Sequence, residues 1–242
     1  CSAAHCCAIA NDKRLKCWGH GSVGRTGYGD ALIRGDANGQ MGDCLPYVNL
    51  GINRTAQTAI TNGAASCVLL DNGKTRCFGH GLYGLLLTGG TTDIGDSATE
   101  IGDNFPYANI GTNRSIVQFT HSASMQSQLT NCALLDDGTV KCWGIGGTQG
   151  LGDNITRGIS ASTVGDCLPT VNFGIGRTAK LITGTSYYGT CVIMDTDQAK
   201  CWGINTRGRL GIGDTLARGG ANLGPDGMGD NLPAINLGEA PY

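Results

Sequence analysis

The apolar residues of this chain occur in short runs that are separated by turns rich in glycine, asparagine and aspartate. The segment 67–77 shows the pattern clearly, with Cys-Val-Leu-Leu, then Asp-Asn-Gly, then Lys-Thr-Arg-Cys. Asn-Gly and Asp-Gly between two such runs are strong signals for a β-hairpin. The pattern therefore predicts an all-β chain of short antiparallel strands without helices.

The same pattern places two cysteines opposite each other. If residues 71–73 form a three-residue loop with Gly73 in the left-handed region, counting outward pairs Cys67 with Cys77, at a separation that a disulfide can bridge. Redox chemistry or metal binding is the alternative, but nine intervening residues on a hairpin suit neither a Cys-x-x-Cys redox site nor a zinc knuckle. We therefore expect four structural disulfides: Cys7–Cys17, Cys67–Cys77, Cys132–Cys142 and Cys191–Cys201.

The hairpins belong to a repeat. Their first cysteines are 60, 65 and 59 residues apart, and a second phrase, Gly-Asp-x-(Leu or Phe)-Pro, recurs in step with them. Two independent phrases with one period indicate a repeat array. We predict a single repeat domain over residues 1–242, with repeats at 1–50, 51–110, 111–173 and 174–242.

A third phrase, an arginine followed by a strand-like run, begins at Arg54, Arg114 and Arg177, and so precedes three of the four hairpins. No such phrase precedes Cys7. The first repeat is therefore expected to lack one strand, which makes the array a part of a longer chain, an open or unusually small array, or an array that a neighbouring molecule completes. Exposed strand edges and apolar faces drive association.

Composition narrows the class of protein. The net charge of −2 gives no polybasic surface for nucleic acid or an anionic membrane. No apolar run approaches the roughly 18 residues that a membrane span needs. Twelve cysteines, eight of them in matched pairs, favour an oxidising compartment and hence a secreted protein.

Four cysteines lie outside the hairpin pattern: Cys1, Cys6, Cys44 and Cys167. One interpretation pairs them within the molecule, for example Cys6 with Cys44, since both lie in the first repeat. The other is an intermolecular bridge from Cys1 or Cys44 of one molecule to Cys167 of another. Both interpretations remain open at the level of sequence.

Candidate metal ligands are few. His5, Cys6 and Cys7 are adjacent, and His20 and His80 are equivalent, but no second ligand cluster accompanies them. An aspartate recurs after glycine in each repeat and is either a calcium ligand or, as we favour, a turn residue that bonds its own backbone, at Asp43, Asp103, Asp166 and Asp230. We expect no metal and no cofactor.

Other candidate chemistry is limited to the surface. Three sequons, at Asn53, Asn113 and Asn154, are possible N-glycosylation sites in a secreted eukaryotic chain. Neither a Gly-x-Ser-x-Gly elbow nor a Gly-x4-Gly-Lys-Ser/Thr phosphate loop occurs. We therefore predict no catalytic residues.

The segment 202–218 reads Trp-Gly-x-Asn-x-x-Gly-x-Leu-Gly-x-Gly-Asp-x-x-x-Arg, and 143–157 is nearly the same. With the preceding Cys-x-Leu-Leu-Asp-x-Gly-x-x-x-Cys, this resembles the repeat of the regulator of chromosome condensation family. The resemblance covers all four repeats and implies a β-propeller with one four-stranded blade of roughly 60 residues per repeat. The cysteine pairs make the chain resemble an extracellular or bacterial branch of the family. The chain has four repeats, whereas the family usually closes a ring of seven blades.

The family's functions do not follow from the resemblance. Nucleotide exchange on a small GTPase needs a projecting wedge and a basic chromatin-binding tail, and the ultraviolet-B photoreceptor relatives carry a Gly-Trp-Arg-His-Thr phrase; this sequence has neither. We predict a secreted, non-catalytic structural or adhesive repeat protein that associates head to tail in an extracellular assembly or filament. The alternatives are a monomeric binding module for a protein or a glycan, and a hydrolase or lyase built on a propeller.

Overall fold

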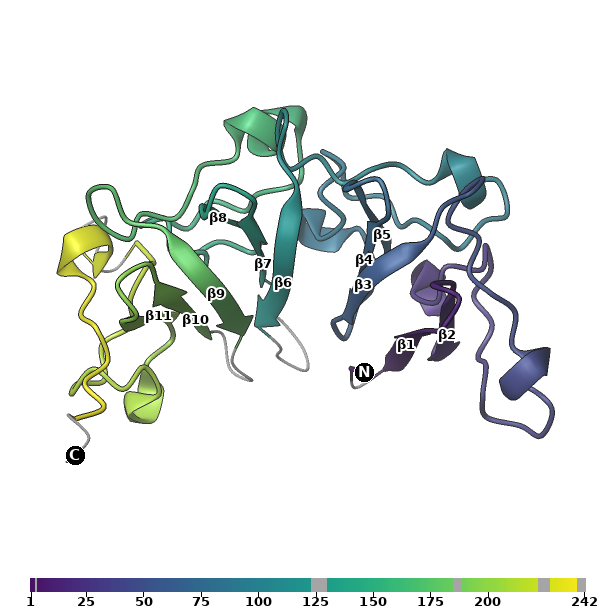
Figure 1. Ribbon diagram of the computed structural model, residues 1–242, viewed down its shortest axis with the longest axis horizontal. Helices are drawn as coiled ribbons and strands as arrows, with labels where there is room; N and C mark the ends of the chain where they lie inside the picture. Colours follow the sequence, from purple (N-terminus) through teal and green to yellow (C-terminus); the bar gives the residue numbers. More distant parts are fainter. Residues whose placement is uncertain (3, 123–129, 185–188, 222–226, 239–242) are drawn as a thin grey trace. The chain divides into compact units, whose positions relative to one another are not determined.

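The computed structural model describes residues 1–2, 4–122, 130–184, 189–221 and 227–238 (Figure 1). The described part of the chain contains β-strands and short 3-10 turns but no α-helix, as the apolar pattern predicts. The strands are β1 (His5–Ile9), β2 (Leu15–Gly19), β3 (Ala56–Thr61), β4 (Ala65–Leu70), β5 (Thr75–Gly79), β6 (Ile116–Ser122), β7 (Thr130–Leu135), β8 (Val140–Gly144), β9 (Ala179–Gly184), β10 (Gly189–Met194) and β11 (Ala199–Gly203).

The 3-10 turns fall into two recurrent sets. One set follows the aromatic-glycine pair of the hairpins: η1 (Ser22–Gly24), η3 (Leu82–Gly84) and η7 (Thr206–Gly208). The other set is the Gly-Asp phrase of each repeat: η2 (Gly42–Cys44), η4 (Gly102–Asn104), η6 (Gly165–Cys167) and η9 (Gly229–Asn231). A further turn, η5, spans Ala161–Thr163.

The strands form three three-stranded antiparallel sheets, β3-β4-β5, β6-β7-β8 and β9-β10-β11, and one two-stranded sheet, β1-β2. The array of small antiparallel sheets confirms the predicted all-β, propeller-like fold. The fourth strand expected in each blade is reduced to isolated bridges, such as Gly144 to Arg157 and Gly203 to Arg218. Arg157 and Thr170 both bridge to β8, and the left-handed Gly158 and Gly165 between them turn the chain too often for a longer strand.

The register of the four hairpins is the one counted from the sequence. Cys7 lies opposite Cys17 and Cys67 opposite Cys77, and the same pairing holds in β7-β8 and β10-β11. Each loop ends in a left-handed residue, which is a glycine in two hairpins but Lys13 (φ 64°) and Asp197 (φ 64°) in the others. The hairpin register is therefore determined by loop length even where glycine is absent.

The chain divides into two compact units: residues 1–116 with 158–168, and residues 117–157 with 169–242. In the first unit Phe78 stacks on Phe105 with ring centroids 5.4 Å apart, and the Leu85–Leu87 run is fully buried. The last residue of that run, Leu87, stands where the first and fourth repeats carry Gly27 and Gly211, and the run supplies side chains to the core.

The second unit has its own continuous core. Trp202 is fully buried and lies 5.7 Å from Phe173 between ring centroids, and the Cys132–Cys142 pair lies within the same cluster. The tryptophan that follows the hairpin is therefore a packing residue here, as is Trp143. Burial of these rings, each worth several kcal/mol on truncation, holds the sheets of the unit together.

Candidate functional site

Consecutive repeats are joined by a recurrent contact, which we call the joint. In the first unit, the Gly-Asp turn η4 of the second repeat receives the loop that ends the first repeat. The N–H of Gly102 donates to the carbonyl of Asn49 (3.1 Å), and Oδ1 of Asp103 accepts the N–H of Ile52 (3.0 Å). A Cβ on Gly102 would lie 2.8 Å from the side chain of Asn49, and its φ is +68°, so the joint requires glycine here.

The bond from the turn glycine to the asparagine carbonyl recurs in both units. In the first unit the N–H of Gly165 donates to Asn109 (2.9 Å), and Asp166 accepts the N–H of Thr112 (2.9 Å). In the second unit the N–H of Gly229 donates to the carbonyl of Asn172 (3.0 Å). Asp103 and Asp166 therefore bond the loop that enters from the preceding repeat, whereas the sequence suggested that the recurrent aspartate bonds its own turn.

A buried cation crosses two of these joints. Nη1 of Arg76 donates to the carbonyl of Leu50 (2.7 Å) and to that of Gly102. Nζ of Lys200, at the equivalent hairpin position, donates to the carbonyls of Phe173 (3.1 Å) and Gly229 (3.0 Å). Burial lowers the pKa of Lys200, because a charged ammonium is less well solvated there. Each cation therefore holds one carbonyl from each side of its joint.

The apolar residue of the incoming loop is buried in every occupied joint. Leu50 is 3% exposed, Ile110 is 7% exposed and Phe173 is 2% exposed. Each follows an asparagine and precedes a glycine in the phrase Asn-apolar-Gly. This phrase is the part of a repeat that enters the Gly-Asp turn of the next one.

The Gly-Asp turn of the first repeat has the same parts but no such loop on it. Nζ of Lys16 donates to the carbonyl of Gly42 (2.6 Å), as Arg76 and Lys200 do in their own turns. A Cβ on Gly42 would meet nothing within 4 Å, and Asp43 is exposed. Lys16, Gly42 and Asp43 form what we call the open turn, whose backbone and carboxylate face solvent in the described structure.

The last Asn-apolar-Gly phrase is exposed in the same way. Leu237 is 86% exposed, and a Cβ on Gly238 would meet nothing within 4 Å. Oδ1 of Asn236 accepts the N–H of Gly238 (2.9 Å), as Oδ1 of Asn172 accepts that of Gly174 (2.9 Å). Asn236, Leu237 and Gly238, which we call the exposed loop, therefore carry the local hydrogen bond of a docked loop without being docked.

The disulfides of the structure differ from one of the pairings that the sequence suggested. The structure joins the four hairpin pairs by disulfides, and it also joins Cys1 to Cys6. The expected pairing of Cys6 with Cys44 is therefore wrong, and Cys1 is not available for a bridge to another molecule. The N–H of Ser2 donates to the carbonyl of His5, which folds the first residues back along β1 and brings Cys1 to Cys6.

Two cysteines remain unpaired. Cys44 and Cys167 are free and exposed, and they occupy the same position in the Gly-Asp turns η2 and η6. Cys44 follows Asp43 directly and so lies at the open turn. The side chains of Cys44 and Cys167 are the only free thiols among the described residues.

The histidines have structural partners. His5 is buried, and its Nε2 lies 2.7 Å from Oγ of Ser66; burial lowers the pKa of His5 to about 4, with the charge of Arg25 acting in the same direction. Cys6 and Cys7 are in disulfides and cannot ligate zinc beside it. Among the described residues there is no cluster of three side chains that could hold a metal ion.

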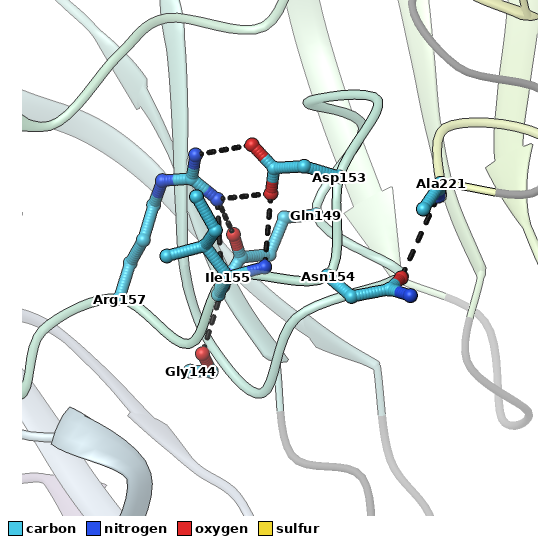
Figure 2. A network of polar contacts seen from close by, with 7 residues as sticks. All are labelled: Gly144, Gln149, Asp153, Asn154, Ile155, Arg157 and Ala221. Atoms are coloured by element: carbon cyan, nitrogen blue, oxygen red, sulfur yellow. Dashed lines mark hydrogen bonds and ion pairs between the residues drawn. The ribbon is translucent and has the colours of Figure 1, made fainter.

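A second recurrent aspartate also has hydrogen-bond partners within the chain, as Figure 2 shows for Asp153. Asp153 makes two bonds to the guanidinium of Arg157 (2.7 and 2.8 Å), and Arg157 also donates to Oε1 of Gln149 (2.7 Å). The hydrogen bond from Arg157 holds the pKa of Asp153 below its usual value. Asp30–Arg34 and Asp214–Arg218 repeat this pair, which braces the glycine-rich turn in three repeats.

The three sequon asparagines lie on the surface. Asn53, Asn113 and Asn154 are exposed, and Asn154 accepts a long hydrogen bond from the N–H of Ala221 (3.5 Å; Figure 2). Their use for glycosylation stays a prediction. No helix in the described part of the chain is long and apolar enough to cross a membrane.

Comparison with solved structures identifies the fold. Prp20p from Saccharomyces cerevisiae matches with a TM-score of 0.64 and 15% identity over 100% of this chain and 50% of its own. Yeast RCC1 (Prp20) bound to Kap60 matches with a TM-score of 0.59 and 16% identity, over 99% of this chain and 48% of its own. Human WBSCR16 matches with a TM-score of 0.50 and 14% identity, over 100% of this chain and 67% of its own. No family model matches the chain.

The chain therefore has the RCC1-like β-propeller repeat fold that its sequence resembles, and it spans about half the length of the yeast structures.

Proposed function

We propose that this protein is a secreted, non-catalytic repeat protein that serves as a structural or adhesive subunit of an extracellular assembly. The observation that carries the proposal is the pair of free, exposed thiols of Cys44 and Cys167, in a chain whose ten other cysteines form five disulfides. In an oxidising compartment such thiols are suited to forming a disulfide with another protein chain.

The disulfides support the proposed compartment. Five cysteine pairs are bonded, and such a density is typical of proteins that fold in oxidising surroundings. The similar solved structures support protein binding as the mode of action, because Prp20p binds Gsp1p and histones and yeast RCC1 is bound to Kap60. The net charge of −2 favours a protein partner over nucleic acid.

The recurrent carboxylates favour a non-catalytic role. Asp103 and Asp166 each accept a backbone N–H from the incoming loop of the joint, and Asp153 is paired with a buried arginine. A general acid or base needs a carboxyl group that can exchange protons with a substrate. Asp103 and Asp166 therefore serve the joints between repeats, and Asp153 braces the glycine-rich turn of its own repeat.

The size of the native protein tests the proposal. We expect species larger than the 24.9 kDa chain in sedimentation and, in part, on non-reducing gels, through a Cys44–Cys167 disulfide between molecules. Cys44→Ser should remove the covalent species and leave the sedimenting assembly. A monomer at every concentration, with Cys44 and Cys167 joined to each other within one chain, would contradict the proposal.

A second candidate is a monomeric binding module for a glycan or a peptide. A cleft of about 570 Å³ in the first unit favours it, lined by residues 72–75, 107–111 and 113–116. Tyr107 offers an aromatic surface in this cleft, although Lys74 (4.7 Å) and Arg76 (4.6 Å) lie over its ring. Binding of a glycan by a monomer, abolished by Tyr107→Ala, would favour this candidate over the first.

A further inference from the structure

We propose that the cleft of the first unit binds an acidic oligosaccharide, through a carboxylate or sulfate group held beside Lys74 and Tyr107. The cleft has a volume of about 570 Å³, which lies in the range of small-molecule sites. Its lining residues, 72–75, 107–111 and 113–116, all belong to the first unit. The inference rests on the second candidate function, whose class of glycan it names, and it does not depend on self-association.

The cleft is positively charged, although the chain as a whole carries a net charge of −2. Two cations lie over the ring of Tyr107: Nζ of Lys74 is 4.7 Å from the ring centroid and the guanidinium of Arg76 is 4.6 Å from it. Arg76 is buried, and it donates to the carbonyls of Leu50 and Gly102 rather than to a carboxylate. Among the described residues, no aspartate or glutamate lines the cleft. These charges favour an anionic ligand.

The first repeat shows how such a cation is neutralised. There Arg14 lies over the equivalent ring, 3.6 Å from the centroid of Tyr47, and it also forms an ion pair with Asp12 (2.6 Å). The second repeat has Asn72 at the place of Asp12. Oδ1 of Asn72 accepts the N–H of Lys74 (3.0 Å), which preserves the hydrogen bond of the turn without a carboxylate. Lys74 forms no ion pair with any described residue, so its charge is available to a ligand.

The uncharged groups of the cleft favour a sugar. Three exposed asparagines line it: Asn72, Asn109 and Asn113. Side-chain amides donate hydrogen bonds to hydroxyl groups and accept hydrogen bonds from them. Tyr107 adds a ring that is partly exposed (38%). The aliphatic lining residues Ile110 and Ile116 are buried, so the surface of the cleft is polar, which favours a saccharide over a peptide.

A buried hydroxyl at the cleft also favours a polar ligand. Thr75 lines the cleft and is 3% exposed, and its Oγ1 has no hydrogen-bond partner among the described residues. The other repeats carry apolar residues at this position of the hairpin: Leu15, Val140 and Ala199. A buried hydroxyl without a partner is costly, and a ligand with hydroxyl groups in the cleft would supply one.

Asn72→Asp tests the charge of the cleft with little disturbance of the fold. It places in the second repeat the carboxylate that pairs with the cation of the first. Asp137 occupies this position in the third hairpin, where its Oδ1 accepts the N–H of Thr139 (3.0 Å), so the turn accommodates aspartate. Asn38→Asp is the matched control, because Asn38 is exposed, precedes a glycine in a turn and lies outside the cleft.

Isothermal titration calorimetry measures the binding of tetragalacturonate, which carries carboxylates, and of a heparin tetrasaccharide, which also carries sulfates. We expect at least one of them to bind, and to bind more weakly as the salt concentration rises. Asn72→Asp and Lys74→Ala should each weaken binding about ten-fold, the loss typical of a hydrogen bond to a charged group. Asn38→Asp and Arg14→Ala should leave binding unchanged, and circular dichroism shows that each variant folds.

Failure of both acidic saccharides to bind, or an unchanged affinity in Asn72→Asp, would overturn the inference. Neutral maltotetraose should bind roughly ten-fold more weakly or not at all. Binding of maltotetraose as tight as that of the acidic saccharides would overturn the inference while leaving the second candidate function standing. Tighter binding of the peptide tetraglutamate would overturn it in favour of an acidic peptide. A protein that assembles but binds neither acidic saccharide would overturn this inference alone.

Discussion

Replacement of Arg76 by alanine is expected to destabilise the first unit by about 3 kcal/mol, whereas Lys16→Ala should cost less than about 1 kcal/mol. The two residues occupy the same hairpin position, one in an occupied joint and the other in the open turn. Arg76 is 2% exposed, and Lys16 is half-buried at the surface. The comparison therefore isolates the effect of the joint.

The cost at Arg76 has two sources. The carbonyl of Leu50 loses a charge-assisted hydrogen bond in a buried site, and an unsatisfied buried acceptor costs about 1–3 kcal/mol. The arginine side chain also packs against the rings of Phe105 and Tyr107, and that contact is lost with it. Urea unfolding with the disulfides intact measures both variants, and equal losses at Arg76 and Lys16 would contradict the role assigned to the cation.

Acidification from pH 7 to pH 4 is expected to lower the free energy of unfolding through His5. Burial lowers its pKa from 6.5 to about 4 in the folded chain, so the unfolded chain binds the proton first. The stabilisation is fully present above pH 6.5 and is lost as the pH falls towards 4. The shift corresponds to about 3 kcal/mol at about 1.4 kcal/mol per pKa unit.

His5→Gln should remove most of this slope, and His20→Gln, at an exposed histidine that contributes least to the lowered pKa of His5, should keep most of it. Carboxylates with lowered pKa values, such as Asp153, lose their contribution only below their ordinary value of 3.8, so they leave the window from 6.5 to 4 unaffected. Urea unfolding at a series of pH values gives the slope. An unchanged slope in His5→Gln would show that another group is responsible.

Local pattern was sufficient to predict the hairpins. The loop at Asp71-Asn72-Gly73 determines which residues pair, and the pairing holds even at Lys13 and Asp197, where the left-handed residue is not glycine. The fold followed from the period of two phrases together with the resemblance of the glycine-rich segments to a known repeat. Both depend on contacts close in sequence.

Contacts between repeats were not predictable in the same way. The sequence shows that Gly-Asp and Asn-apolar-Gly recur with one period, but the hydrogen bond from Ile52 to Asp103 spans 51 residues. The aspartate was therefore assigned to its own turn. The pairing of Cys1 with Cys6 was missed because it depends on a backbone bond from Ser2 to His5. The burial of Leu85–Leu87 in the core was also not predicted, because this segment departs from the repeat pattern.

Hydrogen exchange at the glycine amides of the joints tests the central claim, that the recurrent joint links consecutive repeats, most directly. The N–H groups of Gly102, Gly165 and Gly229 are bonded to the incoming loop, whereas Gly39 lies in an exposed turn and serves as the reference within the same molecule. The account predicts that the three joint amides are protected and that the amide of Gly39 exchanges rapidly. Exchange of the three joint amides as fast as that of Gly39 would contradict it.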